Sequence, residues 1–304
     1  MLKERILSTI RFFDLQDYPL TLLELHRFLI ADMENLKQHI DRQGEIIIGD
    51  IKTQPEIGVD QILVCLDSEC DLEIKNTLGF YHLTGRQNIV HLRLENYFYG
   101  IRREKLIKKY ANFLRHLPFV RGVAIAGSQA MGQEKDSSDI DLFIVTDPSY
   151  MWLARTLVTA YFQILGKRRH GLYIANRFCL NHYLAGPKKI GSLRNLYTAL
   201  EYLKLRPVVY GNSIWSFEQE NSNWLKMFFP NANLKKPIGL KVSKVQEVLE
   251  KVLGGGLGKS LEKALKNWQL PKIRKEDFII VEDDELSFHP QSKQQALLEK
   301  FFQT

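Results

Sequence analysis

The residues of this chain best suited to chemistry are two aspartates, Asp139 and Asp141, at the head of the apolar run DIDLFIV. Side chains alternate across a β-strand, so a strand over 139–145 places both carboxylates on one face. Two like charges this close repel each other, and a cation beside them removes that cost. Mg²⁺ prefers oxygen ligands and commonly joins carboxylates to substrate phosphates. The pair therefore predicts a metal site, although Asp-x-Asp alone is also found at the end of a solvated loop.

A second motif, Gly127-Ser128, supplies groups that suit a phosphate. It follows an apolar strand predicted over 120–126 and precedes Asp139 by a polar spacer. Glycine lets the backbone approach a ligand closely, and the serine hydroxyl and nearby N–H groups can hold phosphate oxygens. With two metal ions, such a site activates an attacking oxygen and stabilises a leaving one.

Composition places the chain among ordinary globular proteins. It has 304 residues, of which 45% are hydrophobic and 25% charged, and only 3 cysteines. That cysteine count gives no disulfide framework and no zinc spacing, and no apolar run is long enough to span a membrane. We therefore expect a reduced, cytoplasmic protein without a membrane segment.

The net charge of +7 is unevenly distributed along the chain. Residues 1–100 hold 10 Lys and Arg against 16 Asp and Glu, and the remainder holds 32 against 19. An acidic N-terminal part and a basic remainder indicate separate modules, and we expect anionic ligands to bind the basic one.

The order of predicted elements indicates a mixed α/β protein. Residues 2–13, 22–30 and 34–43 read as helices, and Thr21 and Glu24 form a capping box at the start of the second. The segment 45–58 reads as strand and loop, 58–67 as a further helix, and 78–83 as a strand. This is the order of a winged helix-turn-helix. Such modules bind DNA through a basic helix, and the acidic charge of this segment disfavours that role over a structural or partner-binding one.

The remaining elements are predicted from periodicity and from Gly and Pro breaks. Their ranges are helices over 91–116, 149–165, 192–206, 240–253, 258–268 and 291–302, a strand over 176–184, and a hairpin within 278–290. The predicted domains are a winged-helix-like module over 1–90, a catalytic domain over 91–232 and a helical accessory region over 233–304.

Residues 120–147 resemble the signature of the DNA polymerase β-like nucleotidyltransferase superfamily, in which Gly-Ser and a spacer precede acidic-apolar-acidic-apolar. More loosely, the chain to about residue 231 is similar to bacterial proteins that join a winged-helix-like segment to such a domain. The looser match rests on DLQDYPLT, GFY, LPFVRGVAIAGS, MWLAR, CLNHYL and the NxxWLKMFFPN stretch. The resemblance implies a mixed sheet, two-metal chemistry with Mg²⁺ or Mn²⁺, and transfer of a nucleotidyl group from an NTP such as ATP.

One departure from the family concerns its third metal-binding carboxylate, which many members carry on a later strand. The matching strand here, NRFCLNHYL, has no acid, and Asn181 stands at that position. An amide offers a carbonyl oxygen but cannot take a proton from an attacking hydroxyl. Catalysis with two aspartates, a carboxylate from elsewhere such as Glu201, and nucleotide binding without turnover all remain open.

Three basic residues complete the predicted nucleotide site. Lys167 and Arg168 stand in a basic loop where they can neutralise a triphosphate, or form a solvated surface. Arg155, in an apolar helix after the aspartate strand, either points at the site or pairs with a buried acid.

Together with these residues, the resemblance implies a magnesium-dependent nucleotidyltransferase. Asp139 and Asp141 are its catalytic metal ligands, and Gly127, Ser128, Arg155, Lys167, Arg168 and Asn181 bind the nucleotide. The acceptor is a small molecule, a protein or an RNA. The alternatives are a regulatory protein that binds a nucleotide without turnover, and a DNA-binding protein that acts through residues 1–85.

Overall fold

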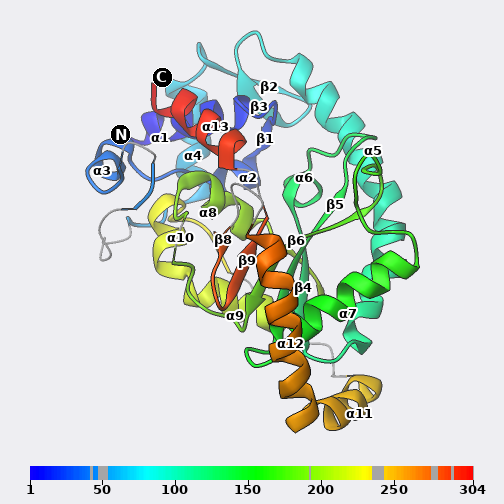
Figure 1. Cartoon of the computed structure of the whole chain (residues 1–304). Coiled ribbons are helices and arrows are strands. Elements are labelled where there is room, and N and C mark those ends of the chain that lie inside the picture. Colours follow the sequence, from blue (N-terminus) through cyan, green and yellow to red (C-terminus); the bar gives the residue numbers. More distant parts are fainter. Residues whose placement is uncertain are drawn as a thin grey trace.

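The structure is a computed structural model that describes residues 1–41, 44–46, 54–191, 193–234, 243–274, 280–288 and 291–303. It is a mixed α/β protein with a six-stranded mixed sheet and a separate three-stranded sheet near the N-terminus (Figure 1). Half of the predicted strand-and-loop segment 45–58, residues 47–53, lies outside the described residues.

The N-terminal part combines short helices with an antiparallel sheet of order β1-β3-β2. Thr21 and Glu24 form the expected capping box at the start of α2. The first strand, β1, was not indicated by the sequence, and the third predicted helix is shorter than expected. The elements are α1 (Leu2–Asp14), β1 (Leu20–Thr21), α2 (Leu22–Arg27), α3 (Met33–Lys37), α4 (Val59–Glu69), β2 (Ile74–Thr77) and β3 (Phe80–Leu83).

The predicted long helix over 91–116 is confirmed as α5 (Asn88–Tyr110), and its last part forms the 3-10 helix η1 (Ala111–His116). Gly100 does not interrupt α5. A Cβ at Gly100 would lie 2.8 Å from Oε1 of Glu134 and 3.3 Å from its carboxyl carbon. The glycine therefore lets a buried carboxylate pack against the helix backbone.

The central sheet has the strand order β7-β4-β5-β6-β9-β8. Only β5 and β6 run parallel, and the other neighbours are antiparallel. The strands are β4 (Val120–Ala126), β5 (Ile140–Thr146), β6 (Phe178–Ala185), β7 (Arg206–Val209), β8 (Ile280–Val281) and β9 (Glu285–Ser287).

Helices cover both faces of this sheet. Phe143 and Val145 of β5 pack in one buried cluster with α8, α9 and α10, while Leu142 and Ile144 pack in a second cluster with η1 and α7. This alternation is what a fully buried strand requires, because each face meets its own layer of helices. The covering helices are α7 (Met151–Ile164), α8 (Leu196–Leu203), α9 (Gly211–Glu220), α10 (Ser222–Phe228) and α12 (Gly256–Ile273).

One sequence prediction is wrong in this region. The helix expected over 192–206 ends at Leu203, and Arg206 to Val209 form the edge strand β7 instead. Pro207 fits there because an edge strand needs no N–H on its outer side. After β4, the chain turns at Gly127 into a short helix, α6 (Gly127–Met131).

The C-terminal region, predicted to be helical, also contributes two strands to the central sheet. The predicted hairpin is confirmed as β8 and β9, and β9 pairs with β6 to extend the sheet. The final helix, α13 (Gln291–Gln303), lies beside α1 near the N-terminus (Figure 1), where the rings of Phe12 and Phe301 are 5.1 Å apart. The domain limits at 90 and 232 stay a prediction, and one buried cluster joins α1, α8–α10 and α13.

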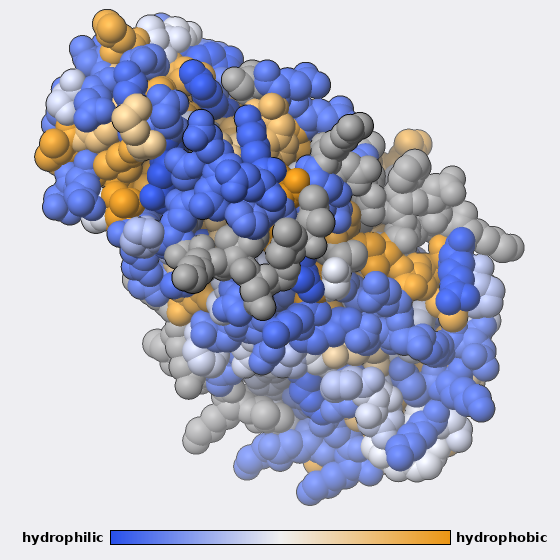
Figure 2. All heavy atoms as spheres, turned by 90° about the vertical axis from the view of Figure 1, so that its left-hand side faces the viewer, coloured by the Kyte–Doolittle hydropathy of each residue, from blue (hydrophilic) through white to orange (hydrophobic). Residues whose placement is uncertain are grey.

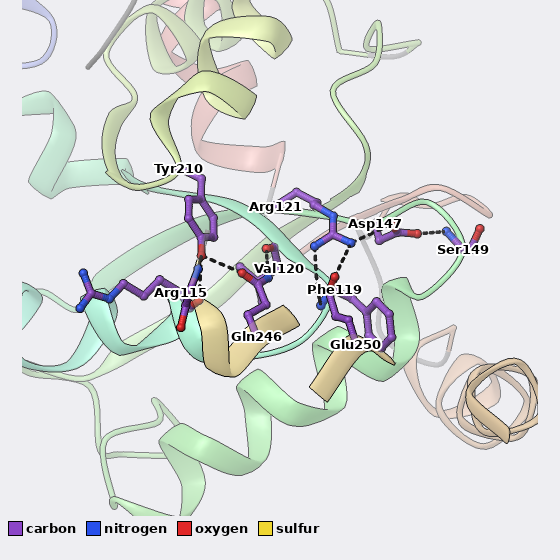
Figure 3. Close-up of polar contacts among 10 residues, drawn as sticks. Arg115, Phe119, Val120, Arg121, Asp147, Ser149, Tyr210, Gln246 and Glu250 are labelled. Atoms are coloured by element: carbon purple, nitrogen blue, oxygen red, sulfur yellow. Dashed lines mark hydrogen bonds and ion pairs between the residues drawn. The ribbon is translucent and has the colours of Figure 1, made fainter. Parts of the chain in front are cut away.

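A partly buried polar network fastens α11 (Lys244–Leu253) to the start of β4 (Figure 3). Glu250 accepts hydrogen bonds from the backbone N–H of Phe119 and from Arg121, both at 2.6 Å. Gln246, fully buried, donates to the carbonyl of Val120 at 2.8 Å. These contacts tie the C-terminal region to the central sheet.

On the face shown in Figure 2, hydrophilic residues cover most of the described surface and hydrophobic side chains form small separate groups. Among the described residues, no helix combines the length and the hydropathy needed to cross a membrane.

Candidate active site

Strands β4 and β5 are antiparallel neighbours, and the two aspartates of the opening motif lie where β4 ends and β5 begins. Ala126 of β4 is the register partner of Asp141 on β5, so Gly127 directly follows the residue opposite that carboxylate. Gly127 has a φ of +60°, and a Cβ there would lie 2.9 Å from the carboxyl carbon of Asp141 and closer still to Oδ2. Only glycine fits both the backbone angle and the space.

Asp139, Asp141 and Cys179 form a compact cluster, in which one ligand atom of each lies within 4.8 Å of the others. Cys179 comes from β6, where it is the register partner of Asp141. The parallel pairing of β5 and β6 therefore brings a sulfur beside the two carboxylates.

A chain of hydrogen bonds connects the cluster. Asn181 donates its amide N–H to Oδ1 of Asp141, and its carbonyl oxygen accepts from the thiol of Cys179. Arg169 donates to Oδ2 of Asp139 at 2.7 Å and to the sulfur of Cys179 at 3.4 Å. Arg169 is thus the cation that balances the pair in this arrangement.

Burial shapes the electrostatics of these groups. Asp141 is only 8% exposed, and burial followed by the charge of Asp139 raises its pKa to about 7. The pKa of Cys179 rises to about 12, mainly through burial and then through the two aspartates. The thiol is therefore neutral near pH 7, whereas metals bind the thiolate.

The donor set of the site suits the divalent ion that the motif implies. Two carboxylates share a site of low exposure, and a charged pair there is expensive without a cation. Hard ions such as Mg²⁺ and Mn²⁺ bind carboxylate and carbonyl oxygens, while a soft zinc site would need the thiolate. The carboxylate oxygens of Asp139 and Asp141 fit Mg²⁺ or Mn²⁺.

Asn181 lies beside the cluster, as the strand match predicts. It is 8% exposed and touches Asp141 directly. Rotation of its amide group by half a turn exchanges the nitrogen and the oxygen, so the same residue can present an oxygen to a cation. It brings no negative charge in either orientation.

Glu201, the other carboxylate considered from the sequence, belongs to α8. Burial and then the charge of Asp141 raise its pKa to about 8. Gln294 of α13 donates to it at 3.4 Å. It is not a member of the three-residue cluster found among the described residues.

The predicted basic residues have separate surroundings. The Lys167 ammonium lies 5.5 Å from the ring centre of Tyr110, directed toward the end of α5. Arg155 donates to Gln269 of α12 and lies over the rings of Tyr183 and Phe288. Arg155 and Arg168 line one groove, whose other walls include Arg169, Cys179 and Asn181.

The sequence did not predict that Arg169 and Cys179 contact the two aspartates. Cys179 precedes Asn181 by two residues, so the alternation of the strand does indicate that both lie on one face. Arg169 follows Arg168 directly, and only the fold shows which of the two meets Asp139.

Comparison of the chain with protein-family models, with curated proteins and with solved structures finds no match.

Proposed function

We propose that this chain is a Mg²⁺- or Mn²⁺-dependent nucleotidyltransferase. It moves a nucleoside monophosphate from an NTP to an acceptor hydroxyl and releases pyrophosphate. The observation that carries the proposal is the approach of Gly127 to Asp141, since it unites a phosphate-binding backbone with the acid pair.

Five residues of the site would bind the ion or the NTP. Asp139, Asp141 and the amide oxygen of Asn181 hold the divalent ion, with Asn181 rotated from its present hydrogen bond. When bound, the ion lowers the pKa of the acceptor hydroxyl and neutralises the charge of the leaving group. Gly127 leaves room for the NTP phosphates beside Asp141, and the Ser128 hydroxyl donates to a phosphate oxygen.

The bonds exchanged are those of an in-line displacement. The acceptor oxygen forms a bond to the α-phosphorus, the bond from that phosphorus to the bridging oxygen breaks, and pyrophosphate departs. The hydroxyl proton is released to solvent. Arg169, whose side chain is 42% exposed, is able to leave Asp139 and follow the phosphate charge.

The test is transfer of label from α-³²P NTPs to a panel of acceptors with Mg²⁺ or Mn²⁺. We expect transfer by the wild type and its loss in Asp139→Ala and Asp141→Ala. Lys188→Ala, which removes an ion pair with Asp284 at the surface, is the control variant. Absence of transfer by the wild type with all four NTPs, and unchanged nucleotide binding in both aspartate variants, would refute the proposal.

A second candidate function is favoured by Asn181, which lacks the charge and basicity of a third carboxylate. In that case the chain binds an NTP as a signal and does not turn it over. Calorimetry separates the two functions, because a sensor binds NTP and metal tightly while the labelled NTP stays intact.

A winged-helix arrangement of the N-terminal part is likewise a proposal, and no contact favours DNA as its ligand. The third helix of that part, α3, is five residues long and carries Glu34 in its first turn and Lys37 in its last. A fragment this short and this weakly charged is a poor match for the phosphate backbone.

A further inference from the structure

A cleft of about 670 Å³ opens between α2, α5 and α6, away from the two catalytic aspartates. Its walls come from these three helices, from Tyr18 and from the link between α8 and β7 (Figure 1). The volume falls within the range of ligand-binding sites in proteins. Its described lining residues do not include Asp139, Asp141 or Gly127. The cleft is therefore a separate candidate site.

Two buried polar side chains line the cleft with an oxygen that the fold leaves unpaired. Gln129 of α6 is 7% exposed, and Glu134, in the loop after α6, is 4% exposed. Among the described residues, Oε1 of Gln129 and Oε2 of Glu134 have no hydrogen-bond partner. A buried polar atom without a partner is costly. We call these two residues the floor of the cleft, and their oxygens suit a ligand that supplies hydrogen-bonding groups.

The two floor residues meet at one point of α5. A Cβ at Gly100 would lie 2.8 Å from Oε1 of Glu134 and 3.7 Å from Nε2 of Gln129. Burial raises the pKa of Glu134 to about 7, so near neutral pH its carboxyl group presents either a lone pair or a proton. An amide beside such a group matches the edge of a purine: both oxygens accept from the N–H groups of guanine, or one accepts from the amino group of adenine while the carboxyl proton is donated to its ring nitrogen.

Apolar side chains line the same cleft where it meets solvent. Tyr97 of α5 is 66% exposed, Ile101 of the same helix is 47% exposed, and Leu23 of α2 is 70% exposed. An exposed aromatic ring gives a flat surface on which a base stacks. The cleft therefore combines a polar floor with an apolar rim.

One of the cations that line the cleft is available for an anion. Arg93 is paired with Glu24 and Arg206 with Glu104, each at 2.7 Å. Arg27 of α2 is exposed, donates to a backbone carbonyl of α8 at 3.2 Å, and forms no ion pair with a described carboxylate. A guanidinium has five N–H donors, so the remaining ones can bind a phosphate.

Lys204 holds the walls of the cleft together. Its ammonium lies 4.1 Å from the ring centre of Tyr18 and 5.1 Å from that of Phe28. It also donates to the carbonyl of Met131, at the end of α6, at 3.4 Å. These contacts join the N-terminal helices to α6 and keep the cleft open without a ligand.

We propose that this cleft binds a purine nucleotide, with the edge of the base at Gln129 and Glu134, its face on Tyr97 and its phosphate at Arg27. The inference goes beyond the proposed transferase function, since the site uses neither the carboxylate pair nor a metal ion. The bound nucleotide contacts both α2 and α6, and α6 is the helix that begins at Gly127. Occupancy of the cleft therefore bears on the position of the phosphate-binding motif.

The test measures nucleotide binding to the full-length chain by fluorescence anisotropy in EDTA, which removes divalent ions. The probes are the methylanthraniloyl (mant) derivatives of GDP, ADP and UDP. We expect both purine probes to bind more tightly than mant-UDP, because uracil offers a single N–H donor between two carbonyl oxygens. Tighter binding of mant-GDP than of mant-ADP identifies guanine as the base, and the reverse order identifies adenine.

Two surface substitutions test the contacts that we assign. Tyr97→Ala and Arg27→Glu should each weaken purine binding about tenfold, because a stacked ring or a phosphate contact is lost. Phe98→Ala is the matched control for the first, since Phe98 is 65% exposed and is not among the described lining residues. Arg102→Glu, on an exposed residue of α5 outside the cleft, is the control for the second.

A buried substitution tests the floor. Gln129→Leu removes one acceptor and should reduce the preference for the purine probes over mant-UDP. Thermal unfolding without nucleotide checks that this variant is folded, and the surface variants test the site even where it is not. If neither purine probe binds the wild type, if mant-UDP binds as tightly as both, or if Tyr97→Ala binds as Phe98→Ala does, the inference is overturned.

The inference and the proposed function fail separately in this design. Asp141→Ala should lose nucleotidyl transfer but bind the purine probes in EDTA as the wild type does. Loss of that binding in Asp141→Ala would place the probe at the carboxylate site and overturn the inference. Binding in the cleft by a wild type that transfers no label from any NTP overturns the proposed function alone.

Discussion

Gly127 and Asp141 are packed so closely that no side chain can stand between them. The Cα of Gly127 faces the carboxylate, and any Cβ would lie 2.9 Å from the carboxyl carbon and 3.1 Å from Cβ of Asp141. The register of β4 and β5 causes this approach, since Ala126 pairs with Asp141. Two motifs separated by a polar spacer in the sequence are therefore a single site in the fold.

The substitution Gly127→Ala should remove activity with little loss of structure elsewhere. The added methyl group must displace Asp141 or the start of α6, and a displacement of about 1 Å in a catalytic group reduces the rate about a hundredfold. Nucleotidyl transfer under saturating NTP and Mg²⁺ measures the effect.

Gly85→Ala is the control variant. It distinguishes the steric clash of an added Cβ with Asp141 from the energetic cost of a positive φ. Gly85 has a φ of +85° and nothing within 4 Å of its added Cβ. Both variants carry the penalty of a left-handed alanine, about 1–2 kcal/mol in stability, but only Gly127→Ala meets a carboxylate. Equal activity in the two variants would show that the close approach has no role.

Local pattern was enough to predict the acid strand, the Gly-Ser motif and most of the helices. Asp139 and Asp141 precede an apolar run that is buried on both faces, and such runs specify their own strand. Thr21 and Glu24 likewise predicted the start of α2, because a capping box joins residues only three positions apart. These features depend on neighbours in the sequence.

The pairing of strands that assembles the site depends on distant contacts and could not be predicted from the sequence. The pairing of β5 with β6 moves from Asp141–Cys179 to Phe143–His182, so β6 carries one extra residue. This bulge ends the simple alternation expected for the strand, and His182 comes to lie on the ring of Phe143 at 4.7 Å. The same holds for β7, because its place at the sheet edge results from pairing with β4.

Asn181→Asp should make the protein more dependent on a divalent ion. A third carboxylate beside the buried Asp141 adds repulsion without metal, so the melting temperature in EDTA should fall by several degrees. Saturating Mg²⁺ or Mn²⁺ should restore it, since a ligand that binds the folded state stabilises it by mass action. Thermal unfolding with and without metal measures both effects.

Asn181→Ala is the control for the lost hydrogen bond to Asp141. This variant should have a lower melting temperature than the wild type in EDTA. Adding metal should raise its melting temperature by no more than it raises that of the wild type. If Asn181→Asp responds to metal no more strongly than Asn181→Ala, position 181 does not face the ion.

Glu134→Gln should change how stability depends on pH. Glu134 is 4% exposed, and burial raises its pKa from 4.5 to about 7, against the opposing charges of Arg103, Arg206 and Lys204. A carboxyl group with a raised folded-state pKa stabilises the protein fully below its unfolded value, and that stability is lost as the pH rises through the folded value. The wild type therefore loses on the order of 3 kcal/mol from this group between pH 4.5 and 7.

Urea unfolding across this pH range measures the difference between variant and wild type. The stability of Glu134→Gln relative to the wild type should increase from pH 4.5 to about 7 and stay constant above it. Glu95→Gln, which alters an exposed carboxylate of α5, controls for the loss of one charge. A constant difference between Glu134→Gln and the wild type across the range would contradict the burial effect.

Gln246→Leu should destabilise the whole chain, because this buried glutamine joins α11 to the central sheet (Figure 3). Its N–H donates to the carbonyl of Val120, and its oxygen accepts from the hydroxyl of Tyr210 at 2.7 Å. Leucine fills a similar volume and leaves both groups without this partner, which costs about 2 kcal/mol in the free energy of unfolding. Gln219→Leu, on the exposed side of α9, is the control for added apolar surface. A single transition shifted to lower urea places α11 in the same cooperative unit as the sheet. A separate early transition, with the main one unchanged, would instead make residues 243–274 an independent unit.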